Sequence, residues 1–266
     1  MDTLHFMNDN HLYKEMVIYI EACESGSMFE NLLTDDMNIY ATTAANSVES
    51  SWGHYCYPDD VINGKHIGSC LGDYYSINWM EDSDSKDSCS ETIGEQFDIV
   101  KAKTTNSHVM EFGDKNIKPE VVGNFEGTCD APSVKDLFST YLNKLKGLAV
   151  EPFGKTYTSW DSRDIKVQYL FHKYMDSKDQ LDAMELQDEI QHRTLIETKF
   201  DRLEKTIKLG ARQGLKNHQC YKELVNEYVD ACGNDEYSLK YFYVFAELCN
   251  QDMMPKSRID LVSGMC

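Results

Sequence analysis

The chain has 266 residues, 27% charged and 41% hydrophobic, a composition typical of a soluble, globular protein with one large or two ordinary domains. Its formal net charge of -19 argues against a nucleic-acid surface and against docking on anionic membranes. No apolar run approaches the roughly 20 residues that a membrane helix needs. Residues 1–6 also lack the basic start and apolar core of a signal peptide. We therefore expect neither a membrane span nor a secretory leader in these residues.

The N-terminal stretch predicts a short amphipathic helix over residues 2–14 and then a strand over residues 16–20. The five apolar or β-prone residues of this strand predict burial on both faces. Cys23 lies just past its end, where ligands bind in open α/β sheets, so its thiol is well placed for nucleophilic attack. The turn through Gly26 offers backbone N–H groups that can stabilise an oxyanion. The alternative is that Cys23 is a buried small hydrophobic residue.

Further along the chain, residues 37–45 and 109–112 predict a second and a third strand, and Asn63-Gly64 predicts a tight turn. The pattern Ser88-x-x-Glu91 predicts a capping box for a helix that carries Ile93, Phe97 and Val100 on one face. Because strands alternate with helices, we expect a parallel-rich α/β sheet with three strands.

The second half of the chain changes from a connector to a helical pattern. Residues 114–165 predict a long connector with one helical piece over residues 134–148. From Asp176 onward the pattern is helical, with a C-cap at Gly210 and two further helices over residues 221–229 and 239–248. The apolar residues that recur at helical spacing in the first of these helices are Ile190, Leu195, Ile196, Phe200, Leu203 and Ile207.

Four cysteines lie in this helical tail: Cys220, Cys232, Cys249 and Cys266. Their separations do not fit a compact zinc site, in which ligand pairs usually lie two to four residues apart. Disulfides are the better interpretation, and the spacing alone leaves all three pairings open. We predict no metal site and no cofactor.

The motif Glu-Ala-Cys-Glu-Ser-Gly around Cys23 resembles the caspase nucleophile signature, with Glu in place of Gln. A longer set of blocks resembles the legumain family, the asparaginyl endopeptidases, in both order and spacing. These blocks are residues 19–28, 40–46, 49–51, 71–73, 79–84 and 107–110. The tail resembles the pro-domain of the same family, so the resemblance covers most of the chain.

The resemblance implies a fold class and a domain organisation. It implies an α/β, caspase-like partial sheet formed by the last three strands of a catalytic domain, followed by an all-α, death-domain-like pro-domain. Residues 1–130 are then the C-terminal part of the catalytic domain, 131–176 a connector, and 177–266 the activation peptide and pro-domain. Since the match begins just before the fourth family strand, we expect the front half of the catalytic domain to be missing. The strand at residues 16–20 would then have an open, apolar edge that favours aggregation.

The resemblance also implies an activity, a cysteine endopeptidase that cleaves after Asn, and after Asp at acidic pH, in lysosomes or vacuoles. Cys23 is the implied nucleophile, with Gly26 in the nucleophile loop. An Asn side chain needs both donors and acceptors in its pocket, and a protonated Asp can mimic it. The residues that match the S1 pocket are Glu21, Ser50, Ser51 and Asp73.

Three further features follow from the resemblance. Asp176 matches the position after which the pro-domain is released, and because it is Asp rather than Asn, we expect processing to require acidic pH. The implied disulfides are Cys56–Cys70, Cys220–Cys249 and Cys232–Cys266, whereas the states of Cys89 and Cys129 stay open. The expected partners are protein and peptide substrates and cystatin-type inhibitors, without nucleic acid or membrane.

None of the eight histidines matches the catalytic histidine of the family, which would lie upstream of Met1. A second hypothesis is therefore a catalytically inactive fragment whose helical tail acts as a binding or inhibitory module for an intact legumain.

Overall fold

In the computed structural model, which describes residues 1–127, 158–210, 212, 214–251 and 254–266, the strand predicted at residues 16–20 forms as β1 (Met16–Ile20). It pairs in parallel with β2 (Ile39–Thr43), which pairs in antiparallel with β7 (Met110–Gly113). The sheet is therefore mixed, and the expectation of a parallel-rich sheet is wrong. Two helices instead of one connect β2 to β7, which returns the chain to the end of the sheet where β2 finishes.

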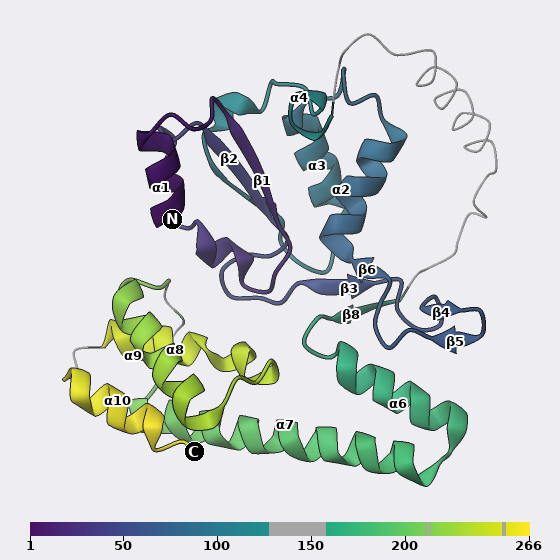
Figure 1. Cartoon of the computed structure of the whole chain (residues 1–266), viewed down its shortest axis with the longest axis vertical. Coiled ribbons are helices and arrows are strands. Elements are labelled where there is room, and N and C mark those ends of the chain that lie inside the picture. The colour runs from purple at the N-terminus through teal and green to yellow at the C-terminus, as the bar shows by residue number, and fades with distance from the viewer. Residues whose placement is uncertain (128–157, 211, 213, 252–253) are drawn as a thin grey trace. The chain divides into compact units, whose positions relative to one another are not determined.

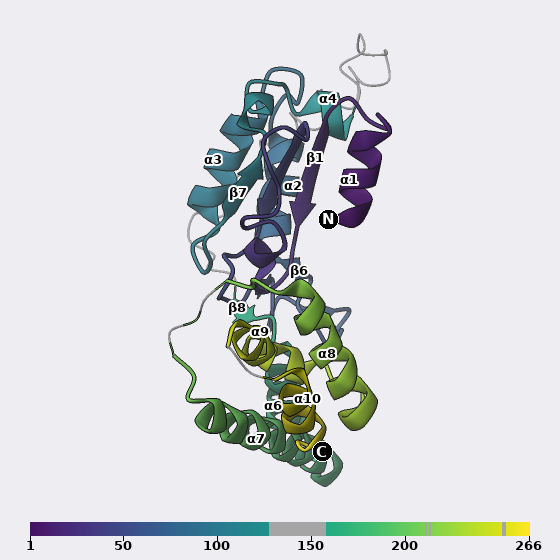
Figure 2. The ribbon, with the colours of Figure 1, turned by 90° about the vertical axis from the view of Figure 1, so that its left-hand side faces the viewer.

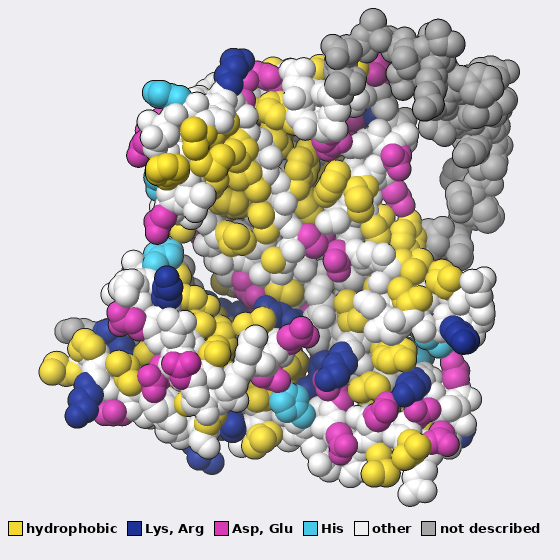
Figure 3. All heavy atoms as spheres, viewed as in Figure 1, with side chains coloured by type: hydrophobic (Ala, Val, Ile, Leu, Met, Phe, Trp, Pro, Cys, Tyr) yellow, Lys and Arg dark blue, Asp and Glu magenta, His cyan; other side chains and the backbone are white. Residues whose placement is uncertain are grey.

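The strand order β1-β2-β7 also corrects the predicted burial of β1. All five residues of β1 are half-buried, whereas all five residues of the central strand β2 are buried. Within the described residues β1 pairs only with β2. It is therefore an edge strand, with a neighbouring strand on one side only. Figure 3 shows hydrophobic side chains gathered over this part of the molecule.

Helices cover both faces of the sheet. Helix α1 (Asp2–Asp9) lies on one face, while α2 (Tyr74–Ser85) and α3 (Ile93–Lys103) lie on the other (Figures 1 and 2). Helix α1 is shorter than the predicted helix over residues 2–14, because the chain turns at His11, where φ is 51°. The core on the α1 face includes Phe29, Leu33, Met37, Ile39 and Ala41. The two clusters on the other face include Ala44, Tyr75, Phe97, Val100 and Val109, and Tyr40, Ile93, Ile117 and Val122.

The capping box of α3 is formed by Thr92 and Glu95, not by Ser88 and Glu91. The Thr92 hydroxyl accepts from the Glu95 N–H at 3.2 Å, and Glu95 Oε2 accepts from the Thr92 N–H at 2.9 Å. Glu91 is instead 7% exposed, and Asp82 of α2 is fully buried. Burial and the adjacent Asp82 carboxyl raise the pKa of Glu91 to about 7, with Lys86 opposing and Glu95 adding to the shift.

We expect Glu91→Gln to flatten the pH dependence of stability. Because the folded pKa of Glu91 lies above its ordinary value of 4.5, the folded state holds the extra proton between about pH 4.5 and 7. The free energy of unfolding should then fall across this window as pH rises, by on the order of 1–3 kcal/mol. Denaturant titrations at several pH values measure this, with Glu30→Gln, which removes an exposed carboxylate, as the control. A wild-type profile as flat as that of Glu91→Gln would contradict the prediction.

The segment between β2 and α2 contains strands that the sequence did not predict, because two or three residues are too few for a periodic pattern. Strand β3 (Trp52–His54) pairs with β6 (Gly72–Asp73) on one side and β8 (Ser159–Asp161) on the other. Strands β4 (Val61–Ile62) and β5 (Lys65–His66) form a hairpin. Asn63 and Gly64 form its turn with positive φ at both positions, as the sequence predicts. Short helical segments complete this unit: η1 (Ser25–Met28), η2 (Lys115–Ile117) and α4 (Gly123–Glu126).

The described residues fall into two units by contact, residues 1–46 with 51–160 and residues 47–50 with 161–266. The second unit is helical, so the chain as a whole is mixed α/β with small sheets. Its helices are α6 (Ile165–Ser177), α7 (Gln180–Ile207), α8 (His218–Cys232), η3 (Tyr237–Tyr241), α9 (Tyr243–Asn250) and α10 (Pro255–Ser263). The helical piece predicted over residues 134–148 lies outside the described residues.

The core of the helical unit confirms part of the predicted apolar stripe on α7. Ile196, Phe200, Leu203 and Ile207 are buried there, packed with aromatic residues of α8, η3 and α9. Ile190 and Leu195 are 49% and 55% exposed, so their inclusion in the stripe was wrong. The C-cap of α7 is Lys208 in the left-handed conformation rather than Gly210. A left-handed cap usually favours glycine, which explains why the sequence pointed to the wrong residue.

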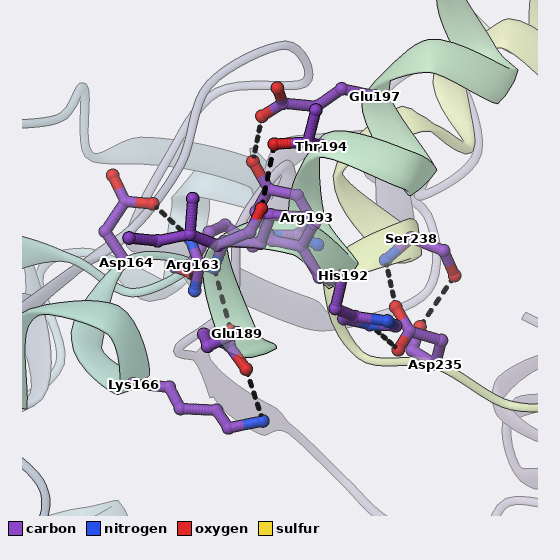
Figure 4. A network of polar contacts seen from close by, with 12 residues as sticks. Arg163, Asp164, Lys166, Glu189, His192, Arg193, Thr194, Glu197, Asp235 and Ser238 are labelled. Atoms are coloured by element: carbon purple, nitrogen blue, oxygen red, sulfur yellow. Dashed lines mark hydrogen bonds and ion pairs between the residues drawn. The ribbon is translucent and has the colours of Figure 1, made fainter. Parts of the chain in front are cut away.

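A network of polar contacts joins α6 to α7 in this unit (Figure 4). At its centre is Arg193, which is 8% exposed. Its Nε donates to Glu189, its Nη1 to Asp164 and its Nη2 to the Arg163 carbonyl, each at 2.8 Å. The guanidinium also lies 4.2 Å from the centre of the Tyr237 ring. Each of the three guanidinium nitrogens therefore has an acceptor, and the group also lies close to an aromatic ring.

Candidate active site

Cys23 is held at the carboxyl end of β1, where the sequence places it, and is half-buried. Among the described residues it is the free cysteine. The Ser51 N–H donates to Cys23 Sγ at 3.4 Å, and Sγ lies 3.7 Å from Ser51 Oγ. The next residue, Glu24, adopts the left-handed conformation with φ of 51°. Such backbone strain in a residue other than glycine is common at functional sites.

In the turn after Cys23, the backbone N–H of Gly26 itself makes a structural hydrogen bond. The Gly26 N–H donates to the Ala45 carbonyl at 3.0 Å, and Gly26 is buried. Ser25 binds the same residue in both directions, because its Oγ accepts from the Ala45 N–H at 3.1 Å and lies 3.3 Å from the Ala45 carbonyl. The Gly26 N–H is therefore engaged in this hydrogen bond and is not available to bind an oxyanion. Its structural role is to fasten the nucleophile loop to the end of β2.

Glu21 lies at the start of the same loop, and its carboxylate reaches the first turn of α2. Oε2 accepts from the Ser76 N–H at 2.8 Å and from the Ser76 hydroxyl at 2.9 Å. Burial raises the pKa of Glu21 to about 7, the two bonds from Ser76 oppose that shift, nearby Asp73 adds to it, and the Ser51 hydroxyl opposes it. Oε1 is buried and makes no hydrogen bond within the described residues.

Two of the other residues expected in the S1 pocket, Ser51 and Asp73, lie close to this carboxylate. Ser51 is 3% exposed and lies between Cys23 and Glu21, since it interacts with both. Asp73 is half-buried at the N-cap of α2, and burial raises the pKa of its carboxyl. Ser50 is half-buried and directly precedes Ser51 in the chain. Cys23, Glu21, Ser51 and Asp73 thus come together in one place, and two acidic groups are available there to accept an amide.

Ser76 is not among the residues that the sequence predicts for this site, although it donates two hydrogen bonds to Glu21. The sequence analysis predicts no helix over residues 74–85, which form α2 in the structure. An Asp followed three residues later by a Ser at the start of a helix could have been a signal, since the first turn of a helix leaves N–H groups without partners.

Two histidines of the unit that contains Cys23, His54 and His66, have partners other than Cys23. His54 Nδ1 lies 2.6 Å from Ser159 Oγ, and its ring stacks on Tyr74 with centroids 4.3 Å apart. Burial lowers the pKa of His54. His66 forms an ion pair with Asp60 at 3.1 Å. Within the described residues, the hydrogen bonds of Cys23 go to Ser51 and not to a histidine.

The cysteines form the bonds that the resemblance implies. Cys56–Cys70, Cys220–Cys249 and Cys232–Cys266 are disulfides. Cys89 is also disulfide-bonded, whereas Cys129 lies outside the described residues. In the described part of the chain, no group of three or more His, Cys, Asp or Glu residues has an arrangement that could hold a metal ion.

Asp176 lies in the last turn of α6 and is exposed, one residue before the helix ends. The chain then turns at Lys178, whose φ is 55°, and α7 begins at Gln180. A protease needs an extended substrate, so a helix end is a favourable place for cleavage because its last turn unwinds most easily.

Comparison with known proteins gives matches to two family models. Residues 1–128 match the Peptidase C13 family, and residues 184–266 match the legumain prodomain. The human legumain is 36% identical over 98% of this chain and 59% of its own length. The vacuolar-processing enzyme beta-isozyme 1 of Oryza sativa subsp. japonica is 33% identical, over 96% of this chain and 54% of its own length. The vacuolar-processing enzyme delta-isozyme of Arabidopsis thaliana is 34% identical, over 100% of this chain and 60% of its own length.

The two matches together define the class of protein, a Peptidase C13 region followed by a legumain prodomain. The chain belongs to the legumain family. It spans somewhat more than half the length of the curated relatives that it matches.

Proposed function

We propose that the chain contributes to a legumain-type cysteine endopeptidase that cleaves peptide bonds after Asn, and after Asp at acidic pH. The observation that carries this is the buried Glu21 carboxyl, with Oε1 unpartnered within the described residues, next to the free thiol of Cys23. In this reaction the Cys23 thiol loses its proton and the thiolate attacks the carbonyl carbon; the C–N bond then breaks, and the amine leaves with the proton that the thiol gave up. Water then hydrolyses the thioester.

The specificity follows from the acidic groups of the pocket. Glu21 and Asp73 accept from the side-chain amide of Asn, and Ser50 and Ser51 supply hydroxyl donors. At a pH well below 7 the Glu21 carboxyl is protonated, because burial raises its pKa to about 7. Its O–H can then donate to the side-chain carbonyl oxygen that Asn and a protonated Asp share, whereas above pH 7 the Glu21 carboxylate accepts from the Asn amide.

The fold and domains proposed from the resemblance complete this picture. We assign residues 1–130 to a caspase-like catalytic domain, 131–176 to a connector and 177–266 to a death-domain-like pro-domain. Since relatives carry the name vacuolar-processing enzyme, we place the working compartment in the lysosome or vacuole. Protein and peptide substrates and cystatin-type inhibitors are the proposed partners.

Hydrolysis of Ala-Ala-Asn, Ala-Ala-Asp and Ala-Ala-Gln fluorogenic peptides at pH 5.5 and pH 7 tests this function. Cleavage after Asn at both pH values, and after Asp mainly at pH 5.5, would support it.

The second candidate is a catalytically inactive module that binds or inhibits an intact legumain. It is favoured by the hydrogen bonds of Cys23, which go to Ser51 rather than to a histidine. Inhibition of an intact legumain by a chain that hydrolyses none of the three peptides would select this alternative.

Processing after Asp176 gives a separate prediction. We expect Asp176→Ala to stop cleavage at the 176–177 junction, because the pocket accepts Asn or Asp and not Ala. Asp176→Asn should be cleaved at that junction up to a higher pH than the wild type, since Asn needs no proton to fit. Each variant is incubated between pH 4 and 7, alone or with an added legumain. Mass spectrometry then measures cleavage at the 176–177 junction. An Ala variant that is cut at the same junction at the wild-type rate would rule the site out.

A further inference from the structure

Ser76 holds Glu21 through two hydrogen bonds to a single oxygen. Its backbone N–H and its hydroxyl both donate to Oε2, at 2.8 and 2.9 Å. Hydrogen bonds to a charged group are stronger than those between neutral groups, and two on the same atom restrict its rotation. Oε2 is thereby occupied, and the two oxygens of Glu21 are no longer equivalent.

The origin of this arrangement is the N-terminus of α2. Asp73 is the N-cap residue of the helix, but its side chain makes no capping hydrogen bond. The first turn of any helix has N–H groups without partners and a partial positive charge. Glu21 supplies the missing acceptor from the end of β1, so a residue 55 positions earlier in the chain caps α2.

The second oxygen of the Glu21 carboxyl, Oε1, has no hydrogen-bond partner among the described residues. Oε1 is buried and makes no hydrogen bond within the described residues, although Ser51 and Asp73 lie near the carboxyl. A buried oxygen without a partner is costly, so it gains most from a ligand that brings a donor. The side-chain NH₂ of an asparagine is such a donor.

We propose that Ser76 is a positioning residue for specificity: it fixes Oε2 of Glu21 and so presents Oε1 to the side-chain amide of the residue before the scissile bond. The role rests on the proposed function, because it assumes that Glu21 lies in the S1 pocket. Ser76 itself does not touch the reacting atoms.

The test measures the rate at which peptide chloromethyl ketones alkylate Cys23, a reaction that does not require turnover. The probes are Ala-Ala-Asn and Ala-Ala-Ala chloromethyl ketone, and iodoacetamide reports the intrinsic reactivity of the thiol. Mass spectrometry of the Cys23 peptide gives the rate constants for the full chain. The variants are Ser76→Ala, Ser76→Thr, which keeps the hydroxyl, and Ser83→Ala. Ser83 is the matched control because its hydroxyl donates to Glu126 at 2.7 Å from the same helix.

At pH 8, where the Glu21 carboxyl is ionised, we expect Ser76→Ala to lower the Asn-over-Ala preference by about 10-fold, through weaker probe binding rather than slower alkylation, because one charge-assisted hydrogen bond is lost. Ser76→Thr and Ser83→Ala should keep the wild-type preference, and iodoacetamide should react alike with all four proteins. An unchanged preference in Ser76→Ala would overturn the role of Ser76 and leave the proposed specificity intact. A wild-type chain without any preference for Asn would overturn both.

Discussion

Cys23→Ser is expected to lower kcat/KM for an Asn substrate by about 10⁴-fold or more, the largest effect of any single substitution in this chain. The reacting species is the thiolate, and a serine hydroxyl ionises far less readily. Serine can still accept from the Ser51 N–H, so the loop should keep its conformation. Rates are measured at pH 5.5 with the fluorogenic Asn peptide.

The control for Cys23→Ser separates chemistry from folding. Ser27→Ala changes an exposed residue of the same loop and should leave both the rate and the melting temperature unchanged. Cys23→Ser should itself melt at the wild-type temperature and bind a non-hydrolysed Asn peptide as tightly as the wild type. If Cys23→Ser kept more than a small fraction of the activity, another residue would have to be the nucleophile.

Arg193→Ala is expected to destabilise the helical unit by about 3 kcal/mol, since a buried carboxylate loses one of its two cationic partners and keeps only Lys166. The carboxylate is that of Glu189, whose side chain is 5% exposed. Burial opposes the ionisation of Glu189, but the bonds from Lys166 and Arg193 outweigh it and hold its pKa below the usual range. The network should therefore lose its charge only under strongly acidic conditions, and the helical unit should retain it at the pH of a lysosome.

Two variants test whether the charge itself or the packing around it matters. Arg202→Ala removes an exposed arginine from the same helix and should change stability by no more than about 0.5 kcal/mol. The double substitution Glu189→Leu with Arg193→Met should restore most of the stability, because a buried ion pair can be replaced by apolar groups of similar volume. Urea denaturation followed by circular dichroism measures all of these. An Arg193→Ala variant as stable as Arg202→Ala would show that the network is not needed for stability.

The sequence does not predict the network drawn in Figure 4. Arg193 was not singled out, because a charged residue in a helix is normally on the solvated face. Only the packing of α6 against α7 encloses it and supplies Asp164, 29 residues earlier in the chain, as a partner. Glu91 is a similar case, since its spacing suggested a helix cap and its true environment is the buried carboxyl of Asp82.

The sequence by itself determined the local features of this protein. Five apolar residues in a row specify β1, Asn63-Gly64 specifies a hairpin turn, and the spacing of Ile196, Phe200, Leu203 and Ile207 specifies the buried face of α7. These signals are readable because they depend on residues close together in the chain.

Only the tertiary structure decided how distant groups share their hydrogen bonds. The N–H of Gly26 donates to the Ala45 carbonyl, and the Glu21 carboxyl accepts from Ser76 in the first turn of α2. The direction of β7 likewise depends on how many helices precede it. Each of these outcomes follows from which unsatisfied backbone group lies nearest once the chain has packed, and no local pattern contains that information.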